Sequence, residues 1–243
     1  MVSLEDKSIT LGHPSYVWQQ GQERRLGLVL KHVDLKGKRL LDIGCGIGAY
    51  LGQFSRFTRH VYGVEVDMER VSRARERAPS VMQAVAERLP FQSGSFDMVF
   101  LHEVLEHVQD DVEALREACR VTRPGGRIVV YVPNRLYPLE THGFYLGKRY
   151  VFRLAPLINY LPDRIRRRLV PHARCYLARD LRRLMAGLPL RQIHWGYVYP
   201  GFDKIAARRP WMASLLRFVT YACEGTPVRI FGLSHFLVIE KTA

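Results

Sequence analysis

Residues 40–48 read LLDIGCGIG, and this stretch decides the fold. It opens with a mainly apolar run that predicts a short buried strand over residues 39–43. Gly44, Gly46 and Gly48 follow. Glycines let the backbone turn sharply and approach a ligand closely, because no side chain intervenes. The stretch therefore predicts a ligand-binding turn at the end of a strand.

The same alternation of strands and helices continues on both sides of this turn. Apolar residues at helical spacing predict helices over residues 20–33, 49–57, 68–78, 111–120 and 178–186. Apolar or alternating runs predict further strands over residues 60–66, 96–101, 127–132 and 190–199. Together they predict an α/β fold with a doubly wound, mostly parallel sheet. In such a sheet the ligand binds beyond the carboxyl ends of the strands.

The length bounds the organisation of the chain. A chain of 243 residues is long enough for one substantial core, so we expect a single domain over residues 1–243. Two stretches interrupt the alternation, residues 135–178 and 204–223. We expect both to be helical insertions that cover a substrate.

Targeting and cysteine signals favour a cytoplasmic protein. The first fifteen residues lack the charged-then-apolar pattern of a signal peptide. No apolar run reaches the roughly 18–20 residues of a membrane-spanning helix. The four cysteines are widely spaced and form no Cys-x-x-Cys pair, so we expect neither a zinc site nor a disulfide framework.

The glycine pattern alone fits two cofactors. Gly44-x-Gly46-x-x-Ala49 also matches the relaxed dinucleotide fingerprint, and Glu65 lies at the distance expected of its ribose-binding acid. An NAD-dependent oxidoreductase therefore remains an alternative at this step. A tight turn that binds no ligand is the other alternative.

Four later blocks separate these alternatives. They read VYGVEVD at residues 61–67, AERLPFQSGSFDMVF at 86–100, HEVLEHV at 102–108 and RVTRPGGRIVVYVPN at 120–134. With LLDIGCGIG before them, they resemble the class I S-adenosylmethionine (SAM)-dependent methyltransferases, particularly the ubiquinone-pathway-like "type 11" group of small-molecule enzymes. The resemblance covers about residues 20–134. It implies a Rossmann-like, mostly parallel seven-stranded sheet with an α-helical insertion, and SAM as the cofactor.

The resemblance assigns cofactor roles around the first two strands. Asp42 is expected to hold the ammonium group of SAM directly or through water, and the amides of Gly44, Cys45 and Gly46 its carboxylate or the waters bound to it. Glu65 is expected to bind both ribose hydroxyls, because a carboxylate accepts two hydrogen bonds in one plane.

The adenine side is assigned in the same way. The backbone at Ala86 is expected to read the adenine edge, with Val66 and Leu101 covering its faces. Many relatives have an Asp before the Ala-Glu pair, where this chain has Val85. Either Glu87 accepts from the adenine amino group instead or this contact is missing.

Glu103, Glu106 and His107 form an E-x-x-E-H pattern after the fourth strand. Spaced at i, i+3 and i+4, they would share one face of a helix. Such a set binds a divalent metal in some relatives, supplies a general base through His107, or forms a polar wall of the site. We expect the wall, name His107 as the catalytic candidate and assign no metal. His102 is expected near the methyl donor.

The positive charge is concentrated in the second half of the chain. Residues 1–133 carry 18 Lys and Arg against 17 Asp and Glu, whereas residues 134–243 carry 19 against 6. The second half also holds 16 of the 26 aromatic residues. The two halves are therefore expected to do different jobs.

Three interpretations of this basic, aromatic half remain open. It is a lid or oligomer surface with solvated arginines, a platform for an anionic membrane surface, or a nucleic-acid-binding surface. Apolar helices flanked by Arg, with Trp195 and Trp211, favour the membrane over nucleic acid. No separate RNA-binding module is visible in the sequence.

The resulting functional prediction is SAM-dependent methyl transfer to a small-molecule or lipid-like acceptor. Oxygen is the expected acceptor atom by analogy with the family. The alternatives are an RNA methyltransferase, a binding protein that keeps the SAM fold without turnover, and an NAD-dependent oxidoreductase. The sequence does not name the acceptor.

Overall fold

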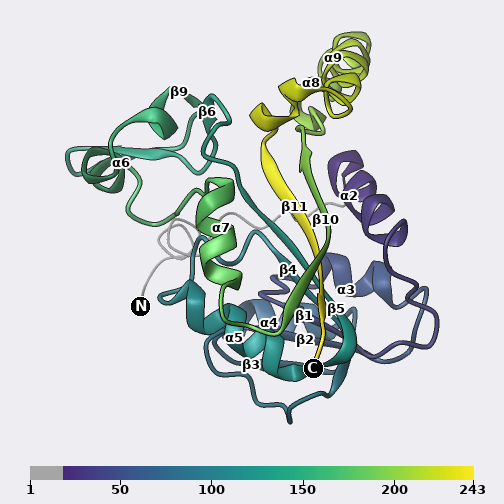
Figure 1. Cartoon of the computed structure of the whole chain (residues 1–243). Helices are drawn as coiled ribbons and strands as arrows, with labels where there is room; N and C mark the ends of the chain where they lie inside the picture. Colours follow the sequence, from purple (N-terminus) through teal and green to yellow (C-terminus); the bar gives the residue numbers. More distant parts are fainter. Residues whose placement is uncertain (1–18) are drawn as a thin grey trace.

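The computed structural model describes residues 19–243 and contains one seven-stranded sheet with the order β10-β11-β5-β4-β1-β2-β3 (Figure 1). Its strands are β1 (Leu40–Ile43), β2 (Val61–Glu65), β3 (Val81–Gln83), β4 (Phe96–His102), β5 (Thr122–Pro133), β10 (Leu190–Val198) and β11 (Ser234–Lys241). Only β11 runs antiparallel to its neighbours. The predicted doubly wound, mostly parallel sheet is confirmed.

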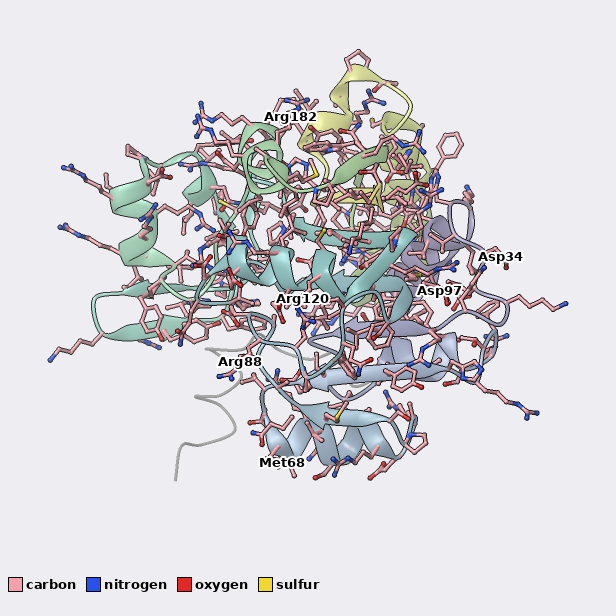
Figure 2. All side chains as sticks on the ribbon, turned by 60° about the horizontal axis from the view of Figure 1, so that its bottom comes forward. Asp34, Met68, Arg88, Asp97, Arg120 and Arg182 are labelled. Carbon is pink, nitrogen blue, oxygen red and sulfur yellow. The ribbon has the colours of Figure 1, made fainter. Side chains whose placement is uncertain are left out.

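Helices cover both faces of this sheet. They are α2 (Gln20–Leu30), α3 (Ala49–Phe54), α4 (Met68–Arg75), α5 (Asp111–Val121) and α7 (Ala178–Met185). All five occupy the ranges predicted from apolar spacing, to within a few residues at their ends. Figure 2 shows the two edges of the sheet, with Met68 of α4 beside β2 and β3, and Arg182 of α7 beside β10.

Alternation along the strands divides the core into two layers. In β4, Met98 and Phe100 pack with α2, α3 and α4, whereas Val99 and Leu101 pack with α5 and α7. Successive side chains of a strand point to opposite faces, so one apolar strand supplies both layers. This is why the run FDMVFL, apolar at every position except Asp97, suits a central strand.

The insertion after β5 differs from the expected helical one. It contains the antiparallel pairs β6 (Leu139–Glu140) with β9 (Ala155–Pro156) and β7 (Phe144–Leu146) with β8 (Arg149–Val151). One short turn, η1 (Ile158–Tyr160), and one helix, α6 (Asp163–Leu169), complete it. Gly147 takes a φ of 61° between β7 and β8, which suits a tight hairpin turn better than a helix.

The second expected insertion is helical. Residues 203–223 form α8 (Asp203–Ala206) and α9 (Pro210–Cys223), and the turn η2 (Pro227–Phe231) follows. Pro210 occupies the first turn of α9, where its missing N–H leaves no helical hydrogen bond unmade. No helix within residues 19–243 is long and apolar enough to cross a bilayer. The N-terminal stretch without a signal pattern lies outside the described residues.

A buried ion pair holds the first insertion together. The guanidinium of Arg166 donates to the carboxylate of Glu140 at 2.9 Å, to the carbonyl of Ala173 at 2.9 Å and to the side chain of Asn159 at 3.2 Å. Arg166 and Glu140 are both almost fully buried. The charge of Arg166 on α6 therefore fixes β6 against the segment that returns to the sheet.

Replacing Arg166 with Met is expected to lower the free energy of unfolding by about 3–5 kcal/mol, because it leaves the Glu140 carboxylate buried without its cation. Arg167→Met is the matched control, since Arg167 is the exposed neighbour on the same helix. It is expected to cost under about 0.5 kcal/mol. Denaturant titrations measure both. Equal losses in the two variants would contradict the account.

Candidate active site

One cavity of about 730 Å³ lies at the carboxyl ends of β1, β2 and β4. The order of the sheet reverses there, because β2 lies on one side of β1 and β4 on the other, as expected of a ligand site in this fold. The cavity is lined by the turn after β1, by the loop after β4 and, from the insertion, by His142. It therefore joins the neutral half of the chain to the basic half.

Glu65, the last residue of β2, holds the glycine-rich turn. One carboxylate oxygen accepts the amide of Gly46 at 2.9 Å, and the other accepts the amides of Val66 at 2.9 Å and Asp67 at 3.1 Å. The side chain is 5% exposed and lines the cavity. Its orientation is thus fixed by the backbone on both sides.

The amides of the turn are largely used within the protein. Those of Gly44 and Cys45 donate to the carbonyl of Val64, and that of Gly48 donates to the carbonyl of Cys45. With the amide of Gly46 on Glu65, these groups shape the cavity and do not present free donors. All three residues line the cavity, and the binding of a carboxylate or its waters by their amides stays a prediction.

Asp42 is a buried carboxyl group on the wall of the same cavity. Burial, and then the nearby charge of Glu65, raise the pKa of Asp42 well above its ordinary value. Two carboxyl groups that share a poorly solvated cavity favour a positively charged ligand.

Only some of the residues predicted to bind the adenine group line the cavity. Val66, Val85, Ala86 and Glu87 line the cavity. One oxygen of Glu87 accepts the backbone amides of residues 109 and 110, at 2.8 and 3.2 Å, so it serves the start of α5. Leu101 does not line the cavity: its side chain is fully buried in the core on the α5 side.

The E-x-x-E-H segment is a series of turns and not a helix. Glu103 takes a φ of 56°, a left-handed conformation that does not propagate a right-handed helix. α5 begins only after Asp110, whose side chain accepts the amide of Glu113. The expected single helical face is therefore wrong, and the three side chains divide between two groups.

Glu103 belongs to a group built around Arg25 of α2. Arg25 donates to Glu103 at 2.9 Å and to Ser234 of β11 at 2.9 Å, and its guanidinium lies 2.7 Å from Nε2 of His102. Burial opposes the charge of Glu103, but the charge of Arg25 outweighs burial and lowers the pKa of Glu103. Burial and Arg25 lower the pKa of His102 to about 3, so His102 is neutral and accepts from Arg25. This group ties α2 to the sheet.

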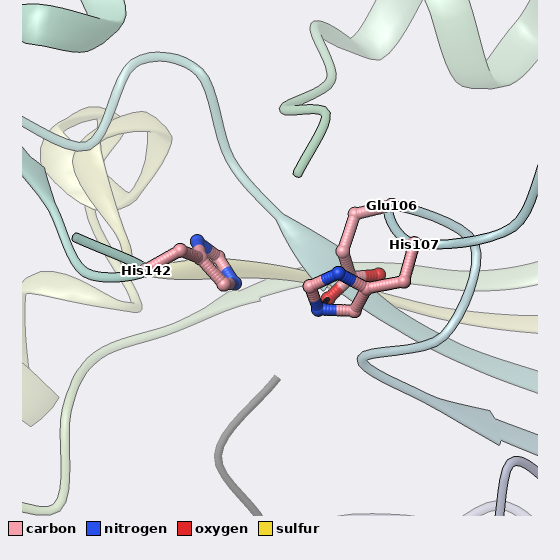
Figure 3. A group of neighbouring side chains, drawn as sticks. All are labelled: Glu106, His107 and His142. Atoms are coloured by element: carbon pink, nitrogen blue, oxygen red, sulfur yellow. Dashed lines mark ion pairs between the residues drawn. The ribbon is translucent and has the colours of Figure 1, made fainter. Parts of the chain in front are cut away.

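Glu106 and His107 meet His142 from the insertion (Figure 3). One ligand atom from each lies within 4.8 Å of the others, and Nε2 of His107 is 4.0 Å from an oxygen of Glu106. No donor within the described residues reaches either buried oxygen of Glu106. Burial, then the charge of Glu103 and a hydrogen bond between the two side chains, raise the pKa of Glu106 well above its ordinary value, so Glu106 is the partner that carries the proton.

The hydrogen bonds of the two histidines fix their tautomers. Nδ1 of His107 lies 2.9 Å from the carbonyl of His172, which only accepts, so Nδ1 carries the proton. Nδ1 of His142 lies 2.9 Å from Glu140, whose pKa is lowered to about 2 because its hydrogen bond to His142 and the charge of Arg166 outweigh burial. His107 therefore keeps the lone pair of its Nε2 for a proton or a ligand, and His142 directs its Nδ1 to Glu140.

This set of groups suits a divalent cation. Imidazole nitrogens and a carboxyl group are ligands that such metals accept, the carboxyl group after loss of its proton. Backbone or carboxylate partners on the opposite ring nitrogens are typical of metal-binding histidines. His142 was missed in the sequence because it lies 35 positions beyond His107, with no spacing to connect them. Arg25 was missed because it resembles any charged residue of an amphipathic helix.

Comparison with known proteins identifies the front half of the chain. A family described as "Methyltransferase domain" matches residues 41–130. The ubiquinone biosynthesis O-methyltransferase of Xanthomonas oryzae pv. oryzae (strain PXO99A) is 34% identical over 139 residues, which span 54% of this chain and 58% of that protein. The enzyme of the same name from Xylella fastidiosa (strain M23) is also 34% identical over 139 residues, 56% of its length. The chain thus matches little more than half of these relatives.

Solved structures share the fold over most of the chain. An S-adenosylmethionine-dependent methyltransferase from Mesorhizobium loti superposes with a TM-score of 0.60 at 18% identity, covering 88% of this chain and 96% of that one. The [4+2]-cyclase SpnF superposes with a TM-score of 0.57 at 22% identity, covering 95% and 84%. Since a cyclase shares the fold, the fold alone does not fix the reaction. The matched segment and the cavity nevertheless coincide: residues 41–130, which match a methyltransferase domain, supply most of the residues that line it.

Proposed function

We propose that the chain transfers a methyl group from SAM to a hydroxyl oxygen of a small-molecule or lipid-like acceptor. The observation that carries this proposal is the single cavity that joins Asp42 and Glu65 to His107 and His142. The first pair suits the methyl donor and the second pair suits the acceptor.

The charge of the cavity supports SAM over NAD. SAM carries a sulfonium and an ammonium group, which suit a cavity lined by Asp42 and Glu65. A dinucleotide would bring an anionic pyrophosphate, which needs free amides at the glycine-rich turn. The amides of Gly44 and Gly46 already donate within the protein. We assign the ribose hydroxyls to Glu65 and the ammonium group to Asp42.

Methyl transfer proceeds by in-line displacement at the sulfonium, so the protein mainly has to position the acceptor oxygen. We assign His107 as the base that takes the hydroxyl proton. Its Nε2 has a free lone pair, and burial, followed by the nearby His142, lowers the pKa of His107 to about 4, so the ring is neutral near pH 7.

Replacing Glu65 with Ala is expected to weaken SAM binding roughly a hundredfold, about 3 kcal/mol, because two charge-assisted hydrogen bonds to the ribose are lost. Glu69→Ala is the matched control, since Glu69 is an acid of the exposed first turn of α4. Calorimetric titration measures SAM and NAD on both variants and on the wild type. Unchanged SAM affinity in a folded Glu65→Ala protein contradicts the ribose assignment, and binding of NAD without SAM contradicts the whole proposal.

Replacing His107 with Gln is expected to lower the transfer rate at saturating SAM by between about a hundredfold and ten-thousandfold, with SAM affinity unchanged. Glutamine fills similar space but does not take up a proton. The assay uses labelled SAM with lipid extract, small metabolites and RNA in parallel. His60→Gln is the control, because His60 is exposed before β2. Full activity in His107→Gln refutes the base assignment, and transfer to RNA alone refutes the acceptor class.

A divalent cation at Glu106, His107 and His142 is the second candidate for the acceptor side, favoured by the buried oxygens of Glu106 that no donor reaches. When bound, it would polarise an acceptor hydroxyl. A cation bound to Nε2 of His107 would occupy the one lone pair of that nitrogen, so His107 could not then act as the base. Calorimetry with Mg²⁺, Mn²⁺ and Zn²⁺ tests it: binding to the wild type that His142→Ala abolishes and His60→Ala retains supports the cation, and no binding of any of the three refutes it.

A further inference from the structure

Helix α9 exposes its most apolar face. Trp211, Leu215, Phe218 and Val219 follow one another at intervals of four, three and one residues, which places them on one side of a helix. Their exposed fractions are 69%, 54%, 77% and 51%. A helix packed on the surface of a globular protein normally buries such a face. A contiguous apolar surface that stays exposed is typical of an interaction site.

The other side of α9 makes the contacts with the protein. Ala213 is its one buried residue among those described. Arg217 donates to the carbonyl of Gly201 at 2.7 Å and to the carboxylate of Asp203 at 3.3 Å. Near its end, Glu224 pairs with Arg24 of α2. The polar side is thus anchored and the apolar side is left to face outward.

Positive charges lie on the segments that precede α9 and on η2, which contacts α9. Lys204, Arg208, Arg209 and Arg229 are exposed, and none forms an ion pair with a carboxylate of residues 19–243. The two acids of the same segment are already neutralised, Asp203 by Arg217 and Glu224 by Arg24. The charge available to a partner is therefore almost entirely positive.

The first insertion continues the same surface. It exposes Leu154 and Leu157 together with Arg153, and Nζ of Lys204 lies 5.5 Å from the centre of the Phe152 ring. The insertion follows the carboxyl end of β5 and α8 follows the carboxyl end of β10 (Figure 1). The active-site cavity opens at this same end of the sheet.

We propose that α9, with the cations around it, binds the surface of an anionic lipid bilayer. An exposed apolar stripe ringed by Lys and Arg is what an interfacial helix needs, because the stripe enters the acyl boundary while the cations meet lipid phosphates. Leu215 and Val219 offer aliphatic surface and no stacking plane, which favours lipid over single-stranded nucleic acid. The inference goes beyond methyl transfer, and its test needs no methyl donor.

Vesicle co-sedimentation of the whole chain tests the proposal. Phosphatidylcholine vesicles are compared with vesicles of equal parts phosphatidylcholine and phosphatidylglycerol, at low and high salt. The wild type is expected to sediment with the mixed vesicles at low salt and to be released by salt. Arg208→Glu/Arg209→Glu is expected to lower the partition coefficient at least about tenfold, as is Trp211→Ser/Phe218→Ser.

Matched controls lie beside the amino end of β2, away from the cavity. Arg56→Glu/Arg59→Glu makes the same change in net charge, and Phe57→Ser removes a partly exposed aromatic ring. Both are expected to bind the mixed vesicles within about threefold of the wild type. Thermal unfolding verifies that every variant is folded, which the exposure of the replaced side chains leads us to expect.

Three results would overturn the proposal. They are equal binding to both kinds of vesicle, equal losses in the α9 variants and their controls, and no vesicle binding by the wild type. Size-exclusion chromatography with light scattering identifies one competing occupant: a dimer that Phe218→Ser dissociates, without vesicle binding, assigns the face to a second copy of this chain. RNA that binds the wild type without any vesicle binding assigns it to nucleic acid.

Discussion

The hydrogen bond between the Glu65 carboxylate and the Gly46 amide connects strand β2 with the glycine-rich turn, and both line the cavity. It joins the end of β2 to the turn after β1 at 2.9 Å, while two further amides orient the same carboxylate. A buried acid needs such donors, and the turn needs an acceptor for its amides. Because each satisfies the other, the hydrogen bond between them holds the turn and the end of β2 in the arrangement that shapes the cavity.

The insertion contributes His142 to the cavity, on the side that we assign to the methyl acceptor, and buried charged groups of the insertion position this histidine. Arg166 neutralises Glu140, Glu140 accepts a hydrogen bond from Nδ1 of His142, and the His142 ring lies beside Glu106 and His107. The basic half of the chain therefore does two things. Its interior completes the site, and its exterior, on α9, offers the apolar and positive surface that we assign to a membrane.

The sequence predicted the elements whose signals are local. LLDIGCGIG specifies a strand and a turn through its own residues, and the later strands and helices have strong apolar periodicity. Contacts between distant segments were not predictable in this way. His142 lies between β6 and β7, and the pairing of β6 with β9 and of β7 with β8 places it at the site. Arg25 is placed by the packing of α2 against the sheet. The turn at Glu103 replaced the expected helix because of one left-handed residue, which spacing alone does not reveal.

A crystal structure with S-adenosylhomocysteine, the product left after transfer, tests the central claim most directly. The account predicts both ribose hydroxyls within hydrogen-bonding distance of the Glu65 carboxylate and the amino group beside Asp42, with the Gly46 amide still on Glu65. The sulfur should lie toward His107 and His142. A product bound elsewhere, or bound in this cavity with its ribose away from Glu65, would contradict the account.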